Sequence, residues 1–384
     1  MVADNNKPTL LILGVHKSSE GYPNVLYRLN DLRTSAAFNV MEINSPFWKE
    51  GAYQRPLLRL PLTLCRSLIA YVALLLRYVR SPTPEFAYVP YPSIFVLAML
   101  SALPRRLRPG RVVADAFISI YDTMANDRNL LKPNNPLARL LHRIEKAAYD
   151  YADLVIVDTS ENAAYLIMEF GLSRDKVKAI PLSTNEVEYR PSLYKLRTGT
   201  LRVLFFGTMV PLHGILTIVE AAAHLKYRTD IEFRLIGDGQ DAPQVEHLIA
   251  RHRPNLVWLR DWLTPDQLAA EVEQSDICLG IFGNTAKAQR VCPLKIYAYA
   301  RVGRPVITGE TEWLHNTVNE LGRSPFASVP IADPTALAYK ILELAENPTL
   351  RSSMAADCQC FYETILSNRV ANAQLTECLN SLKA

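Results

Sequence analysis

A basic loop in the second half of the chain carries side chains suited to holding a phosphate. Lys287, Arg290 and Lys295 occur within thirteen residues that begin at Gly283 and contain no acid. The loop follows an apolar strand-like run and leads into a helix whose first residue is predicted to be Pro293. Cations at such a place bind a diphosphate through charge-assisted hydrogen bonds. We also count Arg290 as a catalytic candidate, because it would stabilise a departing diphosphate. A solvated basic loop is the alternative, and the apolar segments on both sides favour the diphosphate clamp.

A second loop joins a predicted strand to a predicted helix and is bounded by two glycines. It contains four candidate binding residues, which are Gly207, Thr208, His213 and Gly214. Glycines let backbone amides approach an anion, and the N-terminus of the next helix attracts negative charge. Turn geometry alone also explains glycines at such a place, so both interpretations stay open.

Another candidate is Gly239, in the loop Ile236–Gln240 at the end of the next strand. Neither this loop nor the first strand of the chain has the G-x-G-x-x-G pattern, which argues against an ordinary NAD dehydrogenase. The backbone near Leu263, one strand further on, is a further binding candidate.

Acidic candidates occur in the first half. Asp115 follows the predicted strand Arg111–Ala114, Asp122 comes seven residues later, and Asp127 follows. A carboxylate at the end of a strand can orient a hydroxyl group or accept a proton from one. Asp115 and Asp122 can equally cap a helix or accept hydrogen bonds from loop amides. His16 and Lys17 are weaker candidates for contacting a phosphate.

The chain contains no D-x-D pair, a pattern that can hold a divalent ion on a diphosphate. We therefore expect the loop cations to stabilise the leaving group, with no metal and no cofactor.

Short apolar runs alternate with helical patterns in both halves, which predicts parallel sheets built from βαβ units. The predicted strands are 9–14, 86–89, 111–114, 154–157 and 177–180, then 202–206, 232–236, 256–259, 277–282 and 305–308. The predicted helices are 55–79, 93–103, 136–149 and 161–170, then 215–226, 243–252, 265–274, 294–301 and 334–345. A polar linker, 183–200, separates the halves, and the tail 355–382 has a helical pattern.

Several of these segments together resemble the donor-binding core of family 4 glycosyltransferases. The resemblance rests on the apolar run 277–282, the K-A-x-R-V-x-P-x-K segment, the G-R-P-V-I-T segment at 303–308 and the L-I-G-D-G segment at 235–239. It extends over roughly 9–368 and is most specific over 201–311. It implies the GT-B fold, an α/β fold of two Rossmann-like domains whose doubly wound parallel sheets face each other across a cleft. The implied domains are an acceptor-binding domain (1–196), a nucleotide-sugar-binding domain (197–355) and a C-terminal helix that crosses back (356–384).

The chain departs from the family pattern at two acidic positions. Arg290 and Ala298 stand where the family commonly carries two Glu. The usual Arg and Lys of the family's diphosphate clamp fall near Thr208 and His213. Lys287, Arg290 and Lys295 would then supply the missing charge. The departures leave retention or inversion at the anomeric carbon open.

Charge is distributed unevenly along the chain. The net charge is +4, and residues 51–111 contain nine Arg and the single acid Glu85. Basic residues beside apolar helices favour an anionic lipid surface. Exposed Arg on ordinary Rossmann helices are the alternative.

Composition indicates the cellular compartment and the class of protein. Six scattered cysteines indicate a reduced protein rather than a disulfide scaffold, and no apolar leader or spanning segment is recognised. We expect a cytoplasmic protein, peripheral on the inner face of a bacterial membrane, with no nucleic acid among its partners. The predicted function is transfer of a sugar from a nucleotide diphosphate sugar to a lipid-linked saccharide acceptor in bacterial cell-surface glycan synthesis. A catalytically silent nucleotide-sugar-binding protein and a nucleotide-sugar epimerase are the rivals.

Overall fold

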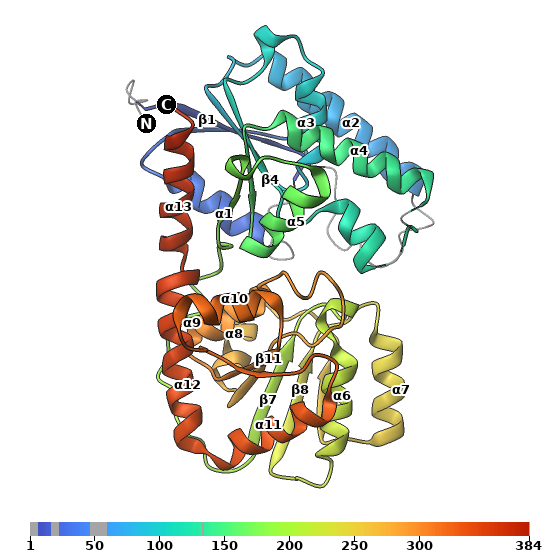
Figure 1. The fold of residues 1–384 in the computed structure, drawn as a ribbon, viewed down its shortest axis with the longest axis vertical. Helices are drawn as coiled ribbons and strands as arrows, with labels where there is room; N and C mark the ends of the chain where they lie inside the picture. The colour runs from blue at the N-terminus through green and yellow to red at the C-terminus, as the bar shows by residue number, and fades with distance from the viewer. Residues whose placement is uncertain (1–6, 17–22, 47–59, 129, 133, 384) are drawn as a thin grey trace. The chain divides into compact units, whose positions relative to one another are not determined.

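The structure is a computed structural model that describes residues 7–16, 23–46, 60–128, 130–132 and 134–383. Its described residues form two compact units (Figure 1). Unit 1 comprises those within 1–125, 131–180 and 372–384, and unit 2 comprises those within 126–130 and 181–371. Lys17, Arg55 and Arg59, which the sequence analysis considered, lie outside the described residues.

Unit 1 contains a parallel sheet of six strands in the order β2-β1-β3-β4-β5-β6. The strands are β1 (Thr9–Gly14), β2 (Asn39–Asn44), β3 (Phe86–Val89), β4 (Arg111–Asp115), β5 (Leu154–Val157) and β6 (Val177–Ala179). β1 and β3 are neighbours, yet the chain leaves β1 toward β2 on the opposite side. The carboxyl ends of β1 and β3 therefore form the topological switch point, where α/β sheets place their ligands.

Helices flank the sheet of unit 1. They are α1 (Pro23–Thr34), α2 (Leu60–Val79), α3 (Ile94–Ser101), α4 (Pro136–Tyr151) and α5 (Ser160–Phe170), together with most of α13 (Asn368–Ser381). Local sequence sets their ends. Asn135 caps α4 by accepting from the Leu137 amide, and Gly171 ends α5 in the left-handed conformation that glycine favours. Alternate strand residues such as Leu11 and Leu13 form one core with the buried faces of α2 to α5.

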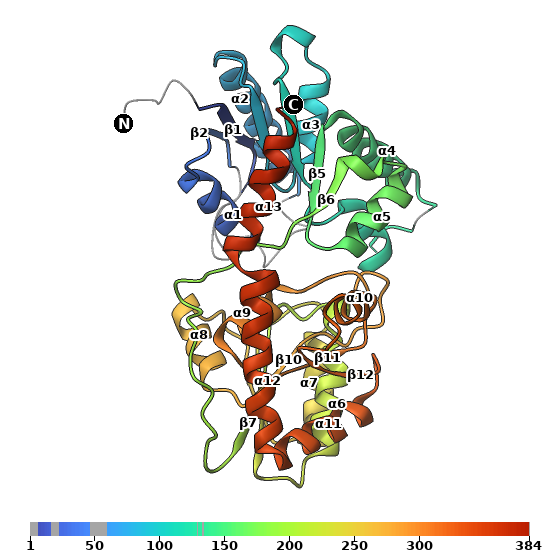
Figure 2. The same cartoon turned by 60° about the vertical axis from the view of Figure 1, so that its left-hand side comes forward.

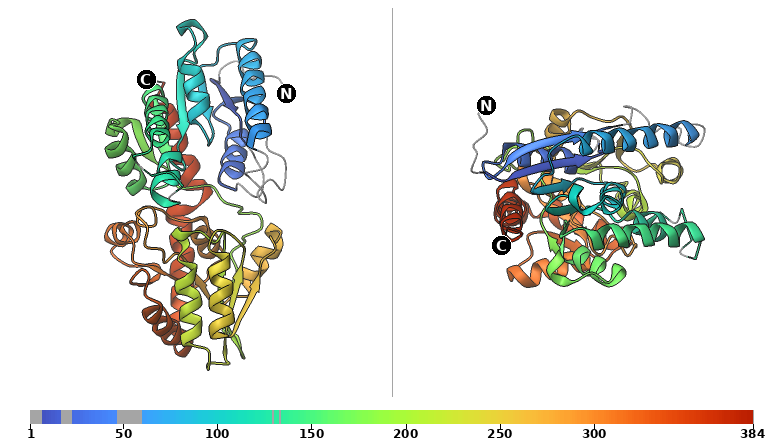
Figure 3. Two further views of the ribbon diagram at one scale, coloured as in Figure 1. Left: turned by 90° about the vertical axis from the view of Figure 1, so that its right-hand side faces the viewer. Right: turned by 90° about the horizontal axis from the view of Figure 1, so that it is seen from above.

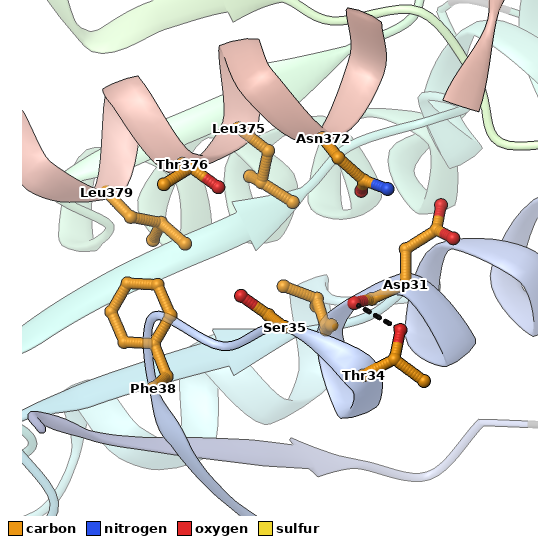
Figure 4. Close-up of a pocket in the computed structure, with 9 residues that line it drawn as sticks. Asp31, Thr34, Ser35, Phe38, Asn372, Leu375, Thr376 and Leu379 are labelled. Atoms are coloured by element: carbon orange, nitrogen blue, oxygen red, sulfur yellow. Dashed lines mark hydrogen bonds between the residues drawn. The ribbon is translucent and has the colours of Figure 1, made fainter. Parts of the chain in front are cut away.

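The C-terminal helix α13 lies beside α1 in unit 1 (Figure 2). A small cavity of about 140 Å³ separates the two helices, and Figure 4 shows Leu375 and Leu379 of α13 opposite Phe38. The ammonium of Lys383 lies 5.0 Å from the centre of the Phe38 ring. None of the predicted site residues lines this cavity.

Unit 2 contains a second parallel sheet, in the order β12-β11-β10-β7-β8-β9. The strands are β7 (Leu201–Phe206), β8 (Ile231–Ile236), β9 (Leu256–Leu259), β10 (Ile277–Leu279), β11 (Val306–Gly309) and β12 (Ala327–Val329). This is the order of the dinucleotide-binding Rossmann fold, with the switch point between β7 and β10. The loops after these two strands are the glycine-bounded loop and the basic loop singled out from the sequence.

Helices cover both faces of the sheet in unit 2 (Figure 2). They are α6 (Ile215–His224), α7 (Ala242–His252), α8 (Pro265–Glu273), α9 (Leu294–Val302), α10 (Glu312–Leu321), α11 (Pro334–Glu346) and α12 (Pro348–Phe361). The faces of α6, α7 and α11 that meet the sheet supply Ile218, Val245 and Ile341 to the core, each fully buried.

Most predicted elements are confirmed, several of them with identical ends. β5 and β9 have the predicted ends because both are short apolar runs bounded by polar residues. The sequence analysis missed α1, β2, α10 and β12. β2 is an edge strand with only Ile43 buried, so it lacks the apolar run by which the other strands were recognised. The predicted tail helix is divided by a π-helical turn, Tyr362–Leu366, between α12 and α13.

Within the described residues, no helix combines the length and the apolar character needed to cross a membrane.

Candidate functional site

The backbones of three loops are in direct contact at the switch point of unit 2. A Cβ atom on Gly237, whose φ is +127°, would come within 2.2 Å of the Gly207 carbonyl oxygen. A Cβ on Gly283 would come equally close to the carbonyl oxygen of Pro211. Glycine is required at both places by this close approach, since no side chain fits there. The packing leaves the ends of β7, β8 and β10 lined by backbone.

Lys295 lies directly beside the glycine-bounded loop. A Cβ on Gly207 would lie 3.2 Å from the Lys295 Nζ, so the missing side chain leaves room for the ammonium. Lys295 is 4% exposed, and its Nζ lies 3.8 Å from the centre of the Phe205 ring. No oxygen of the described residues accepts a hydrogen bond from this Nζ. Burial lowers the pKa of Lys295 well below its ordinary value, because a charged group loses its water there.

The sequence assigns Lys295 both to the end of the basic loop and to the predicted helix 294–301, and the structure has it in the helix. Lys295 belongs to the first turn of α9, which begins at Leu294. Pro293 has an extended conformation, with φ −71° and ψ 145°, and is the N-cap residue instead of the first helical residue. The first turn of a helix carries amides without a partner inside the helix, and these attract anions.

His213 lies in the short helical turn Pro211–His213, just before α6. Its Nδ1 contacts the backbone carbonyl of Thr208, so the neutral imidazole donates from Nδ1 and keeps Nε2 as an acceptor. Burial lowers the pKa of His213 well below its ordinary value, and the charge of Lys295 acts in the same direction. A negative charge beside the imidazole would act in the opposite direction.

The basic loop is packed into unit 2. Ala288 and Cys292 are almost fully buried, and the backbone carbonyl of Gln289 accepts from the Trp313 amide at 2.9 Å. Lys287 is 11% exposed at its side chain and forms an ion pair with Asp127, at 3.7 Å between Nζ and Oδ2. Asp127 belongs to 126–130, which cluster with unit 2. Lys287 is therefore not solvated, in contrast to the alternative interpretation of the basic loop.

Arg290 lies on the same loop and donates from Nη1 to the Ala286 carbonyl at 3.0 Å. Gly214 and Gly239 line the packed loops described above, and Thr208 is exposed beside them. Leu263 follows β9, two strands from β7, and lies further along the same edge. Unit 2 thus gathers the predicted glycines and cations at one end of its sheet, with Leu263 at the periphery.

Asp115 is the last residue of β4 in unit 1 and is 8% exposed. Its Oδ2 accepts a 2.8 Å hydrogen bond from the Tyr88 hydroxyl, and its Oδ1 accepts from the Phe117 amide at 3.1 Å. Burial raises the pKa of the Asp115 carboxyl, whereas the positive charge of Arg28 acts against that shift. One oxygen of Asp115 therefore binds a loop amide, as the alternative interpretation expected.

Asp122 begins a π-helical turn, Asp122–Asp127, and is 4% exposed. Its backbone amide donates to the Ser119 hydroxyl at 3.1 Å. The loop before it is held by Glu145 of α4, which accepts from the amides of Ile120 and Tyr121 at 3.0 and 2.8 Å. Burial raises the pKa of Glu145.

Sequence reasoning missed Arg28, Tyr88 and Glu145 as partners of the acidic segment. The only available signal for Glu145 was an acid on the apolar face of a predicted helix.

His16 is 1% exposed at the end of β1, with Nε2 3.4 Å from Glu42 Oε1. Within the described residues, no group of three or more His, Cys, Asp and Glu side chains has an arrangement that could hold a metal ion.

Unit 2 contains the segment that matches a known protein family. Residues 200–347 match the family model described as "Glycosyl transferases group 1". The D-inositol 3-phosphate glycosyltransferase of Pseudarthrobacter chlorophenolicus is 28% identical over 212 residues. That match covers 49% of this chain and 50% of the relative, so the chain spans about half the length of the curated relative it matches.

Solved structures match nearly the whole chain at low identity. Sucrose-phosphate synthase from Thermosynechococcus elongatus has a TM-score of 0.72 at 15% identity, covering 98% of this chain and 99% of that chain. HepE of Anabaena, solved in complex with UDP and glucose, has a TM-score of 0.67 at 16% identity, covering 97% and 100%. With its two Rossmann-like parallel sheets, the chain has the GT-B fold, as predicted.

Proposed function

We propose that the protein is a glycosyltransferase that moves a sugar from a nucleotide diphosphate sugar to an acceptor hydroxyl. One observation carries the proposal: a buried ammonium, Lys295, faces Gly207 at the switch point of unit 2 with no hydrogen-bond acceptor among the described residues. A buried cation without a partner is costly, and a diphosphate would supply the missing acceptors. The match of residues 200–347 to the group 1 glycosyltransferase model supports the same assignment.

The proposed reaction exchanges one bond at the anomeric carbon of the donor sugar. The bond between the anomeric carbon and the diphosphate oxygen breaks, a bond to the acceptor oxygen forms, and the acceptor hydroxyl gives its proton to the departing diphosphate oxygen. Lys287, Arg290, Lys295 and a protonated His213 stabilise the charge that develops on the departing diphosphate. Asp115, with Asp122 beyond it, orients hydroxyl groups of the sugar or the acceptor.

The donor is best tested first with UDP and UDP-glucose, the ligands named for HepE. We expect either probe to raise the melting temperature of the protein, since a ligand at a hundred times its Kd adds about 2.7 kcal/mol of stability. GDP and ADP serve as comparison nucleotides. Failure of every nucleotide tested, in a protein that melts cooperatively, would contradict the proposed donor site.

Metal independence is part of the proposal, because the cations of the basic loop would stabilise the leaving group in place of a metal ion. Transfer is expected to continue in excess EDTA. Complete loss of activity that manganese or magnesium restores would show that these cations are insufficient.

The proposed acceptor is a saccharide carried on a lipid, used in bacterial cell-surface glycan synthesis at the inner face of the membrane. The basic, acid-poor segment between residues 51 and 111 supports this acceptor. Transfer to a lipid-linked saccharide should exceed transfer to the same saccharide without its lipid. Equal rates would favour a soluble acceptor.

One observation favours a silent nucleotide-sugar-binding protein instead. Arg290 and the buried Ala298 occupy the positions at which the resembled family commonly has Glu. Binding of UDP-glucose with no turnover of any acceptor would select this second function. Conversion of the sugar without any acceptor would instead indicate an epimerase.

A further inference from the structure

Helix α2 of unit 1 has two apolar faces, and only one of them is used by the core. Ala70, Leu74 and Tyr78 recur at helical spacing and are at most 7% exposed. Five apolar residues point the other way, with exposures of 43–67%: Leu68, Ile69, Val72, Leu76 and Val79. At about 100° per residue, the second set is centred nearly opposite the first. An ordinary surface helix would carry polar residues there.

The exposed apolar face continues onto α3. Phe95 is 43% exposed, and its ring contacts the Tyr71 ring edge-on, with 6.0 Å between centroids. Burial raises the pKa of Tyr71 to about 12. We call the five exposed residues of α2 together with Phe95 the α2 surface. Figure 3 shows α2 at the periphery of unit 1, where this surface is accessible.

Cations flank the α2 surface on one side. By the same helical spacing, Arg66 and Arg77 lie along one edge of the apolar face, and Arg80 directly follows the end of α2. Arg66 and Arg80 are exposed, and Arg77 donates to the Asn44 carbonyl at 2.7 Å. Helix α2 itself contains no acid, and Glu85 is the only acid between residues 51 and 111.

We propose that the α2 surface docks on an anionic lipid bilayer, with α2 lying in the plane of the interface. An apolar face bordered by Arg has the chemistry of interfacial helices, which insert their apolar side chains and hold anionic headgroups with the cations. A second copy of the chain fits less well, because α2 contains no acid that could pair with the Arg side chains of its own copy. Docking on a bilayer does not depend on the proposed transferase reaction. The inference that the acceptor is lipid-linked does rest on that reaction.

Vesicle co-sedimentation of the full chain tests the proposal. Binding is expected to vesicles of phosphatidylglycerol mixed with phosphatidylcholine, to fall with added salt, and to be weak on phosphatidylcholine alone. The double variant Val72→Ser, Leu76→Ser and the double variant Arg66→Glu, Arg80→Glu should each weaken binding at least tenfold. Each removed Arg accounts for about a fivefold loss.

Matched control variants test whether lipid binding depends on the α2 surface or on any exposed apolar or basic side chain. Met168→Ser removes an 84% exposed apolar side chain on another helix of unit 1, and Arg251→Glu reverses an exposed charge in unit 2. Both should bind vesicles like the unaltered protein. Melting temperature and the UDP-induced shift, measured in every variant, report folding and the proposed donor site separately from lipid binding.

Three results would overturn the proposal. Equal binding to neutral and anionic vesicles, or binding to neither, contradicts an anionic lipid partner. Equal losses in the controls would show that the α2 surface is not the contact. A dimer in light scattering that Leu76→Ser dissociates would identify a second copy as the occupant.

Discussion

The ammonium of Lys295 lies 3.8 Å from the centre of the Phe205 ring, under the glycine-bounded loop of unit 2. The ring face attracts the cation, but it cannot replace the water molecules that accept hydrogen bonds from the ammonium in the unfolded chain. The pair therefore leaves a buried ammonium with unused donors beside Gly207. An anion that reaches this place would gain a partner whose desolvation cost was already met in folding.

Replacing Lys295 by Met should separate stability from binding. The variant loses a buried amine that has no hydrogen-bond partner among the described residues, so its free energy of unfolding should rise by about 1–3 kcal/mol at neutral pH. The pKa of Lys295 is lowered in the folded protein. The buried amine therefore costs the protein no stability through its protonation above about pH 10.4, and this cost grows as the pH falls below that value. The gain from Lys295→Met should therefore be smallest at alkaline pH. Denaturant unfolding across this pH range measures it.

The same variant should bind UDP about ten- to a hundredfold more weakly, which titration calorimetry measures. Lys226→Met, at an exposed position of the same unit, is the control for removing a positive charge. A Lys295→Met protein with unchanged UDP affinity would refute the proposed diphosphate contact.

Binding of UDP should take up protons. The pKa values of Lys295 and His213 are lowered in the folded protein, and a diphosphate beside them would raise both. At pH 8 the terminal phosphate, with a pKa of about 6, is already ionised and has no proton to release. Calorimetry in buffers of different ionisation enthalpy counts the protons taken up. Lys295→Met and His213→Asn should each reduce the number, and uptake unchanged in both variants would count against protonation of these two groups.

Removing Arg290 or Lys287 should reduce turnover more than it reduces stability. Each loses charge-assisted hydrogen bonds to the diphosphate, with a loss of roughly 1.5–3 kcal/mol. Arg290→Ala is the cleaner test, because Lys287→Ala also removes the ion pair with the buried Asp127. The double variant Lys287→Ala, Asp127→Asn corrects for that loss. Steady-state kinetics and melting temperatures are compared, and normal kinetics in Arg290→Ala and in the double variant would exclude the loop from the mechanism.

Asp115→Asn should flatten the pH dependence of stability. The pKa of Asp115 is raised in the folded state, so its stabilising contribution is present below about pH 3.9 and is lost as the pH rises through the folded value. The variant should therefore gain stability relative to the unaltered protein between pH 4 and neutrality, while the amide oxygen still accepts from Tyr88. Denaturant unfolding at several pH values tests this, with Tyr88→Phe as the control for the hydrogen bond. Parallel curves for the two proteins would contradict a raised pKa.

Short-range information in the sequence was sufficient for most of the fold. Runs such as Leu154–Val157 and Leu256–Leu259 are apolar and bounded by polar residues, so both strands could be predicted with their ends. β2 could not be recognised, because an edge strand with one buried residue lacks that pattern. The order of the strands in each sheet was also undetermined, since pairing joins segments far apart in the chain.

The sequence by itself determined which residue types occur in the candidate site: two glycine-containing loops, a run of cations without acids, and acids after a strand of the first half. Only the tertiary structure decided how they are used. Lys295 lies against Phe205 and faces Gly207, although ninety residues separate it from Phe205 in the chain. Burial and charge set its pKa, and both depend on neighbours brought together by sheet packing, which no local spacing encodes.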